Sequence, residues 1–184
     1  MKIVVFATPQ ENPFPVRLEK GRPEPHDGML LLLAGVGRRA AERLDAALDA
    51  HPAARVVIEF GGAAGVADAA VGDHHTVTRL FDTGGAVVGT LPAVPGLAPA
   101  AAVCGETIYR GEAFPWGAAA GMPLLYTMET AVLHAVCRRR GLSFHSIRLV
   151  TDDGRGDIRG RYEHTLAARR DATIEVLRLF GEAP

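Results

Sequence analysis

Hydrophobic residues gather in short continuous runs, separated by segments rich in glycine, proline or charge. Apolar runs of five to eight residues are typical of strands that are buried on both faces of a parallel sheet. The pattern predicts such strands at residues 2–7, 29–34, 55–60 and 144–151. A hairpin is expected where two β-branched runs, residues 76–81 and 86–91, flank the turn sequence Asp-Thr-Gly-Gly.

Helical periodicity appears between these strands. The spacing i, i+3, i+4, i+7 and i+8 predicts an apolar helix stripe made of Met128, Ala131, Val132, Ala135 and Val136. Three arginines crowd the last turn of this helix, and Gly141 is expected to cap it. An earlier helix is predicted from Ala40 to about His51, and a closing helix covers residues 166–180.

The remaining segments are expected to be connections. Residues 9–27 read as a long polar loop with five prolines, residues 92–102 as a low-diversity linker before a short strand at 103–104, and residues 154–160 as a charged loop. No repeat or second core is evident. The sequence therefore predicts one α/β domain over residues 1–184, with a central mixed, twisted β-sheet flanked by helices.

Composition narrows the class of protein. The chain has 184 residues, of which 48% are hydrophobic and 22% charged, an ordinary globular balance. A formal net charge of −1 argues against a general affinity for nucleic acid. Two cysteines, Cys104 and Cys137, are too few for a disulfide framework, and the first apolar run is too short for a signal peptide or membrane span. We expect a cytoplasmic protein with no membrane partner.

Two acidic residues mark a candidate site. Asp152 stands where the strand at 144–151 leaves the sheet, and Glu129 stands at a helix start. Ligands of open α/β sheets collect just outside the carboxyl ends of strands, so both acids could face one crevice. Glycine-rich turns after the second and third strands, the latter holding Gly61 and Gly62, suggest that backbone meets ligand at close range.

The ordered set of motifs resembles the nucleoside phosphorylase/nucleosidase superfamily, and most closely its hydrolase branch, the methylthioadenosine/S-adenosylhomocysteine nucleosidases and futalosine hydrolases. The resemblance spans nearly the whole chain. Its motifs are Gly35-Val36-Gly37, Phe60-Gly61-Gly62-Ala63-Ala64-Gly65, Val71-Gly72-Asp73, Gly105-Glu106-Thr107, Met128-Glu129 and Arg148-Leu149-Val150-Thr151-Asp152. It implies hydrolysis of the N-ribosidic bond of a purine-type nucleoside, without a cofactor.

The resemblance also implies roles for single residues. Asp152 matches the general acid that protonates the leaving base, although Thr-Asp-Asp-Gly is also good turn chemistry. Glu129 matches the residue that accepts hydrogen bonds from the ribose hydroxyls, with Met128 against the sugar face; its plainer interpretation is a carboxylate that favours a helix N-terminus.

The water-orienting carboxylate is less easily placed. The nucleosidases carry a glutamate just after the first strand, supported by an arginine that Arg148 matches. A gapless count places Asn12 at the glutamate's position and Glu11 one residue before it. Glu11 is the only carboxylate within reach of that turn and is our candidate, with a solvated loop charge as the alternative.

Other positions bear on the reaction and the substrate. Phosphorylases of the superfamily hold phosphate with an arginine and a serine, where this chain has Glu59 and Gly62, so hydrolysis is favoured over phosphorolysis. Ile108 stands where the nucleosidases place an aromatic residue against the base, with Tyr109 adjacent, and Thr127 replaces another acid. The substrate's base and 5′ substituent therefore stay open.

The expected partners are a small nucleoside and, by resemblance, a second copy in a homodimer, although the segment between Phe81 and Cys104 is shorter than the family's. His74 and His75 are neighbours on an expected strand and should point to opposite faces, a poor pair for a metal, so no metal is expected. The alternatives are a nucleoside phosphorylase and a non-catalytic nucleoside-binding homologue.

Overall fold

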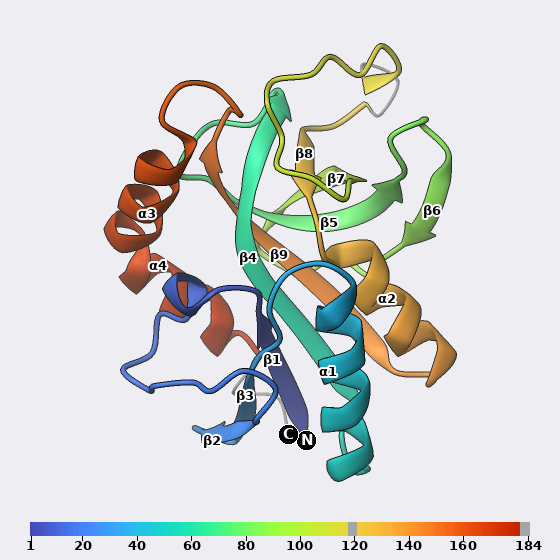
Figure 1. Cartoon of the computed structure of the whole chain (residues 1–184), viewed down its shortest axis with the longest axis vertical. Helices are drawn as coiled ribbons and strands as arrows, with labels where there is room; N and C mark the ends of the chain where they lie inside the picture. Colours follow the sequence, from blue (N-terminus) through green and yellow to red (C-terminus); the bar gives the residue numbers. More distant parts are fainter. Residues whose placement is uncertain (118–120, 181–184) are drawn as a thin grey trace.

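A mixed β-sheet with helices on both of its faces forms the centre of the molecule (Figure 1). The structure is a computed structural model that describes residues 1–117 and 121–180. Within them the strands are β1 Lys2–Phe6, β2 Glu24–His26, β3 Met29–Leu33, β4 Val56–Ala67, β5 His74–Phe81, β6 Val87–Thr90, β7 Ala98–Cys104, β8 Leu124–Thr127 and β9 Ser143–Asp152. The helices are η1 Pro9–Glu11, α1 Arg38–Ala50, α2 Thr130–Arg139, α3 Ile158–Ala168 and α4 Arg170–Arg178.

The long strand β4 organises the sheet. Its first half lies between β1 and β9 and runs parallel to both, and its second half pairs with β8 in the antiparallel sense. β5 pairs with β9 and β7, and β7 pairs with β8. These pairings close β4, β9, β5, β7 and β8 into a ring, from which β1, β3 and β2 extend on one side and β6 on the other.

Two apolar layers cover the faces of the sheet. On one face, α1 and α2 lie side by side (Figure 1) and bury the stripe Ala40, Leu44, Ala47 and Leu48 together with residues of α2. Arg140, just after α2, bonds to Asp45 and Asp49 of α1 and ties the pair at the surface. On the other face, α3 and α4 pack Leu166 and Leu177 against strand residues.

Much of the predicted pattern is confirmed. The runs 2–7, 29–34 and 144–151 are strands, the hairpin is β5 and β6 in antiparallel pairing, and the first helix buries the predicted stripe. Gly141 follows α2 with a φ of 67°, a left-handed conformation suited to a cap. In the described part of the chain, no helix is both long and apolar enough to cross a membrane.

The third predicted strand was too short. β4 does not end in a turn at Gly61 but runs through both glycines to Ala67. A Cβ atom on Gly61 would collide with Arg148 and Glu11, and one on Gly62 would come within 2.5 Å of the Tyr162 ring. The glycines therefore serve close approach of side chains to the strand rather than a reversal of the chain.

The second predicted helix was misplaced at its start. Glu129 is the N-cap of α2, as expected, but Met128 of the predicted stripe lies outside the helix, directly after β8. The buried positions of α2 are Thr130, Leu133, Val136 and Cys137, while Ala135 of the predicted stripe is exposed. The neighbouring apolar residues Ala131 and Val132 had shifted the predicted face by one position.

Three predicted connections contain regular structure. The linker at 92–102 includes most of β7, the loop at 9–27 holds η1 and β2, and the loop at 154–160 runs into α3. The predicted closing helix is two helices, α3 and α4, that meet at Arg169. Alanine- and proline-rich sequence hid β7, because alanine carries little strand signal of its own.

Leu44 provides a test of the α1 face. Leu44 is fully buried between α1 and the sheet, so Leu44→Ala removes apolar contacts and leaves a cavity. We expect the free energy of unfolding to fall by about 2–5 kcal/mol in urea denaturation. Leu179→Ala is the matched control, because Leu179 is 55% exposed, and should change it by less than about 0.5 kcal/mol. Equal losses in the two variants would contradict this packing.

Candidate functional site

A cavity of about 580 Å³ opens where the ends of β1, β8 and β9 meet the middle of β4 and the start of α3. Six of the eight residues given a catalytic or binding role from the sequence line it: Glu11, Gly62, Ile108, Met128, Glu129 and Asp152. Gly61 and Arg148 do not line it and lie behind its wall. Segments that are far apart along the chain therefore contribute to one hollow.

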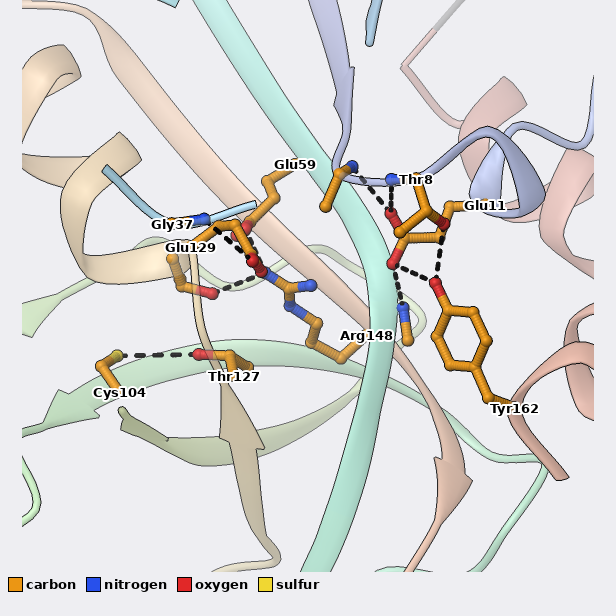
Figure 2. Close-up of polar contacts among 12 residues, drawn as sticks. Thr8, Glu11, Gly37, Glu59, Cys104, Thr127, Glu129, Arg148 and Tyr162 are labelled. Atoms are coloured by element: carbon orange, nitrogen blue, oxygen red, sulfur yellow. Dashed lines mark hydrogen bonds and ion pairs between the residues drawn. The ribbon is translucent and has the colours of Figure 1, made fainter. Parts of the chain in front are cut away.

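Glu11 ends the short helix η1 and is almost fully buried. Its Oε2 accepts hydrogen bonds from the backbone N–H groups of Ala7, at 2.7 Å, and Thr8, at 3.0 Å. Its Oε1 accepts from the N–H of Gly62, at 3.0 Å, and from the hydroxyl of Tyr162, at 2.9 Å (Figure 2). The fold thus fixes this carboxylate at the cavity wall.

Opposing effects act on the pKa of Glu11, and burial is the largest of them. Burial raises the pKa of Glu11 above its ordinary value, although the positive charge of Arg148 and the hydrogen bonds to the carboxylate act in the opposite direction. Asn12, the position favoured by a gapless count, instead bonds within its own loop to Val16 and Phe14. Between the two, Glu11 is the side chain that reaches the cavity.

Arg148 lies in β9 behind the cavity wall, with only 1% of its surface exposed. Its Nη2 forms an ion pair with Glu59 of β4 and donates a hydrogen bond of 2.6 Å to the hydroxyl of Thr130 at the start of α2 (Figure 2). Its charge also attracts Glu11 and Glu129. A single buried guanidinium thereby links the sheet to α2 and to two carboxylates of the cavity.

Glu129 holds the N-cap position of α2 and faces the cavity. Burial, together with the like charges of Glu11 and Glu59, raises the pKa of Glu129 to about 7, against the attraction of Arg148. Its Oε1 accepts one long hydrogen bond, 3.4 Å, from the backbone N–H of Gly37. No side-chain cap bond to α2 is formed, so the carboxylate has acceptor positions free for another partner.

Asp152, the last residue of β9, also lines the cavity. Its Oδ1 accepts from the N–H of Gly154 and its Oδ2 from the hydroxyl of Thr151, both at 2.8 Å. The turn interpretation of Asp152 therefore holds, and the residue faces the cavity as well.

Ile108 and Met128 form apolar parts of the wall, with Ile108 more than half exposed at the rim. The adjacent Tyr109 is buried, and its ring stacks on that of Tyr126 with 5.1 Å between centroids. Tyr109 also packs against Gly154, two residues beyond Asp152. An aromatic surface therefore adjoins Asp152, although it comes from the residue after Ile108.

Sequence reasoning missed two residues of this site as contributors. Tyr162 fell between a predicted loop and a predicted helix, and no sequence signal marked it. Glu59 was considered only as an obstacle to phosphate, but a charged residue inside the apolar run 55–60 is itself a signal, because a buried charge needs a partner. Among the described residues, no group of three or more His, Cys, Asp or Glu side chains is placed to hold a metal ion.

Solved structures of known proteins share this architecture. No protein-family model matches the chain, and no curated protein matches it in sequence. A futalosine hydrolase mutant of Helicobacter pylori matches with a TM-score of 0.74 at 14% identity, over 97% of each chain. The S-adenosylhomocysteine nucleosidase of Streptococcus pyogenes in complex with 5-methylthiotubericidin matches with a TM-score of 0.75 at 17% identity, over 100% of this chain and 98% of that one. The chain has the nucleosidase fold.

A further match of the same kind is the 5′-methylthioadenosine/S-adenosylhomocysteine nucleosidase of S. pneumoniae with the transition-state inhibitor MT-ImmA, with a TM-score of 0.73 at 17% identity over 100% of this chain and 99% of that one. The nucleosidase fold confirms the architecture that the ordered motifs implied. At such low identity the fold alone is shared, so the roles of residues in this chain rest on the geometry of its own site.

The raised pKa of Glu129 predicts a pH-dependent stability. A carboxyl whose pKa is about 7 in the folded state and near 4.5 in the unfolded state stabilises fully below pH 4.5 and loses that contribution as pH rises through 7. Glu129→Gln has no such loss, so it should be more stable than the parent at pH 8, by about 3 kcal/mol, and similar at pH 4.5. Urea denaturation at both pH values measures this, and parallel pH slopes would contradict it.

The buried pair of Glu59 and Arg148 yields a second stability test. Glu59→Gln keeps the shape of the side chain but removes the ion-pair partner of a guanidinium that is 1% exposed. We expect a loss of about 3 kcal/mol in urea denaturation at pH 7, because the buried guanidinium loses its ion-pair partner. The double variant Glu59→Leu, Arg148→Met should lose more than Glu59→Gln alone, because Glu11 and Glu129 then also lose the positive charge that offsets theirs. An equal or smaller loss in the double variant would contradict this role of Arg148.

Proposed function

We propose that the protein hydrolyses the N-ribosidic bond of a purine-type nucleoside, as the methylthioadenosine/S-adenosylhomocysteine nucleosidases do. The observation that carries the proposal is the meeting of three buried carboxylates, Glu11, Glu129 and Asp152, in one cavity with an aromatic wall. A cavity of about 580 Å³ is of the size that small-molecule sites have. The nucleosidase fold and the order of the motifs support the same reaction.

The ribose is held by Glu129 in this proposal. Two oxygens of one carboxylate can each accept a hydrogen bond from adjacent hydroxyls, and Glu129 has acceptor positions free in the cavity. Met128, next to it and also on the cavity wall, supplies an apolar contact for the sugar face. Because the pKa of Glu129 is about 7, its grip on hydroxyls strengthens as pH rises through neutrality.

The base lies at the other end, beside Asp152 and the ring of Tyr109. Asp152 gives a proton to a nitrogen of the base as the bond between that base and C1′ breaks, and the bonding electron pair leaves with the base. A neutral base is a much better leaving group than its anion. The stacked rings of Tyr109 and Tyr126 offer a flat apolar surface for a purine.

Water completes the reaction on the side of Glu11. The water oxygen bonds to C1′, one water proton passes to Glu11, and the other stays on the new ribose hydroxyl. The proton on Glu11 returns through solvent to Asp152, so acid and base are both restored. Arg148 keeps its place behind Glu11 and offsets the cost of the buried negative charge.

Water rather than phosphate is the proposed attacking group. An anion needs free donors, but the N–H of Gly62 already donates to Glu11, and Arg148 is paired with Glu59 behind the wall. Two carboxylates, Glu11 and Glu129, would repel phosphate in the cavity. The homodimer implied by the resemblance and the cytoplasmic location expected from the composition stay predictions.

A nucleoside panel tests the function directly. We expect free base to appear from at least one purine nucleoside at the same rate with and without 10 mM phosphate, measured by chromatography. Asp152→Asn should lower this rate roughly 10²–10⁴-fold, because the proton donor is lost. Asp153→Asn is the matched control, since the neighbouring carboxylate lies outside the cavity and bonds to Arg161 at the surface.

The same panel separates the alternatives. Release that requires phosphate and yields ribose 1-phosphate would indicate a phosphorylase. Binding of a nucleoside in calorimetry, with no base released after long incubation, would indicate a non-catalytic binding protein. Equal rates for Asp152→Asn and the parent would overturn the role of Asp152.

A further inference from the structure

The carboxylate of Glu11 has no acceptor position to spare. It receives four hydrogen bonds, from the N–H groups of Ala7, Thr8 and Gly62 and from the hydroxyl of Tyr162. A carboxylate offers about four lone-pair positions in all. A water molecule can therefore bond to Glu11 only if one of these donors gives up its place.

Three of the four donors are fixed by the backbone. The N–H of Gly62 belongs to β4, and those of Ala7 and Thr8 lie in the turn that leads into η1. The ring of Tyr162 is fixed as well, because it lies so close to Gly62 that a Cβ there would approach its Cε2 to 2.5 Å. Only the Tyr162 hydroxyl can change partner without moving the chain, by rotation about its C–O bond.

A second partner for that hydroxyl is already in reach. Thr8 Oγ lies 2.8 Å from the Tyr162 oxygen (Figure 2). Tyrosine has one hydroxyl proton, and it is donated to Glu11, so Thr8 supplies the proton between the two hydroxyls. Rotation of both hydroxyls reverses this bond. Tyr162 then donates to Thr8, and Oε1 of Glu11 is open to water.

We propose that Tyr162 is a positioning residue for the water-activating carboxylate: its hydroxyl bonds to Glu11 in the resting site and turns to Thr8 when water takes its place. This inference rests on the proposed hydrolysis and adds to it the residue that controls access of water to Glu11. Tyr162 lines the cavity from α3, so it lies beside the space that the substrate and water share.

The charges around Glu11 agree with this role. Burial raises the pKa of Glu11, whereas the charge of Arg148 on β9 and the hydroxyl of Tyr162 on α3 act to lower it. Glu129, at the start of α2, brings a like charge near it. Burial and the charge of Glu11 raise the pKa of Tyr162. Tyr162 therefore stays protonated and acts as a hydrogen-bond donor, not as an acid or base.

Two substitutions separate the two states of the hydroxyl. Tyr162→Phe removes a donor to the ionised carboxylate, so the acid limb of the kcat/KM profile should move to higher pH, with about a tenfold loss on that limb. Thr8→Val keeps the bond to Glu11 but removes the second partner, so kcat should fall roughly tenfold while the acid limb stays in place.

Thr165→Val is the matched control. It removes another buried hydroxyl from the same helix, one that bonds to the carbonyl of Thr151 and does not touch Glu11. We expect it to leave the position of the acid limb unchanged, whatever it does to stability. Tyr162→Phe with the pH profile of the parent, or Thr8→Val with the kcat of the parent, would overturn the proposal.

A titration independent of catalysis keeps this inference distinct from the proposed function. Carboxyl ¹³C NMR of the parent and Tyr162→Phe, with Glu11→Gln to assign the signal, should show Glu11 titrating at higher pH in Tyr162→Phe. If no nucleoside yields free base but the titration shifts, the proposed function fails and the control of Glu11 by Tyr162 stands. An unshifted titration overturns the inference itself.

Discussion

One buried guanidinium, that of Arg148, interacts with three buried carboxyl groups at the centre of this protein. Arg148 pairs with Glu59 and attracts Glu11 and Glu129, all of them removed from water. A carboxylate in such surroundings is costly unless a partner or hydrogen bond offsets the lost hydration. The turn after β1, the start of α2 and the middle of β9 must therefore meet at one place, and the cavity lies beside it.

The close approach of these segments depends on two residues without side chains in β4, Gly61 and Gly62. Gly61 leaves room for Arg148 and Glu11, and Gly62 leaves room for the ring of Tyr162 while its own N–H reaches Glu11. Glycine weakens a strand interior, since it adds no side chain to packing and loses more entropy on folding. Here the strand is held instead by neighbours on both sides, β9 along most of its length and β1 or β8 on the other edge.

The sequence predicted the parts of the fold that single runs of residues determine. Continuous apolar residues predict buried strands such as 2–7 and 144–151, and the acidic residue at the end of the latter indicated Asp152 as a site residue. What it did not predict depends on contacts between distant segments. In the sequence the two glycines of β4 suggest a turn, and only the folded chain shows that Tyr162 and Arg148 pack against them. β8 was not predicted because its four residues form a strand only by pairing with β4 and β7.

The same distinction applies to the site. Because ligands collect at strand ends, Glu129 and Asp152 were expected to face one crevice, and both line the cavity. Burial decides between Glu11 and Asn12, which no count along the chain could. Tyr162 lines the cavity from α3 and bonds to Glu11 across 151 residues of sequence. A single tyrosine on a short helix carries no mark of such a partner, so only the folded chain reveals it.

The cost of burying the negative charges of Glu11 and Glu129 bears on the proposed reaction. Burial raises the pKa of both Glu11 and Glu129, so their negative charges are costly in the free site. Cleavage of an N-ribosidic bond builds positive charge on the sugar, which would lie between these two carboxylates. Charges that are costly without substrate become favourable as that positive charge develops, and a preorganised site of this kind lowers the barrier without binding the ground state more tightly.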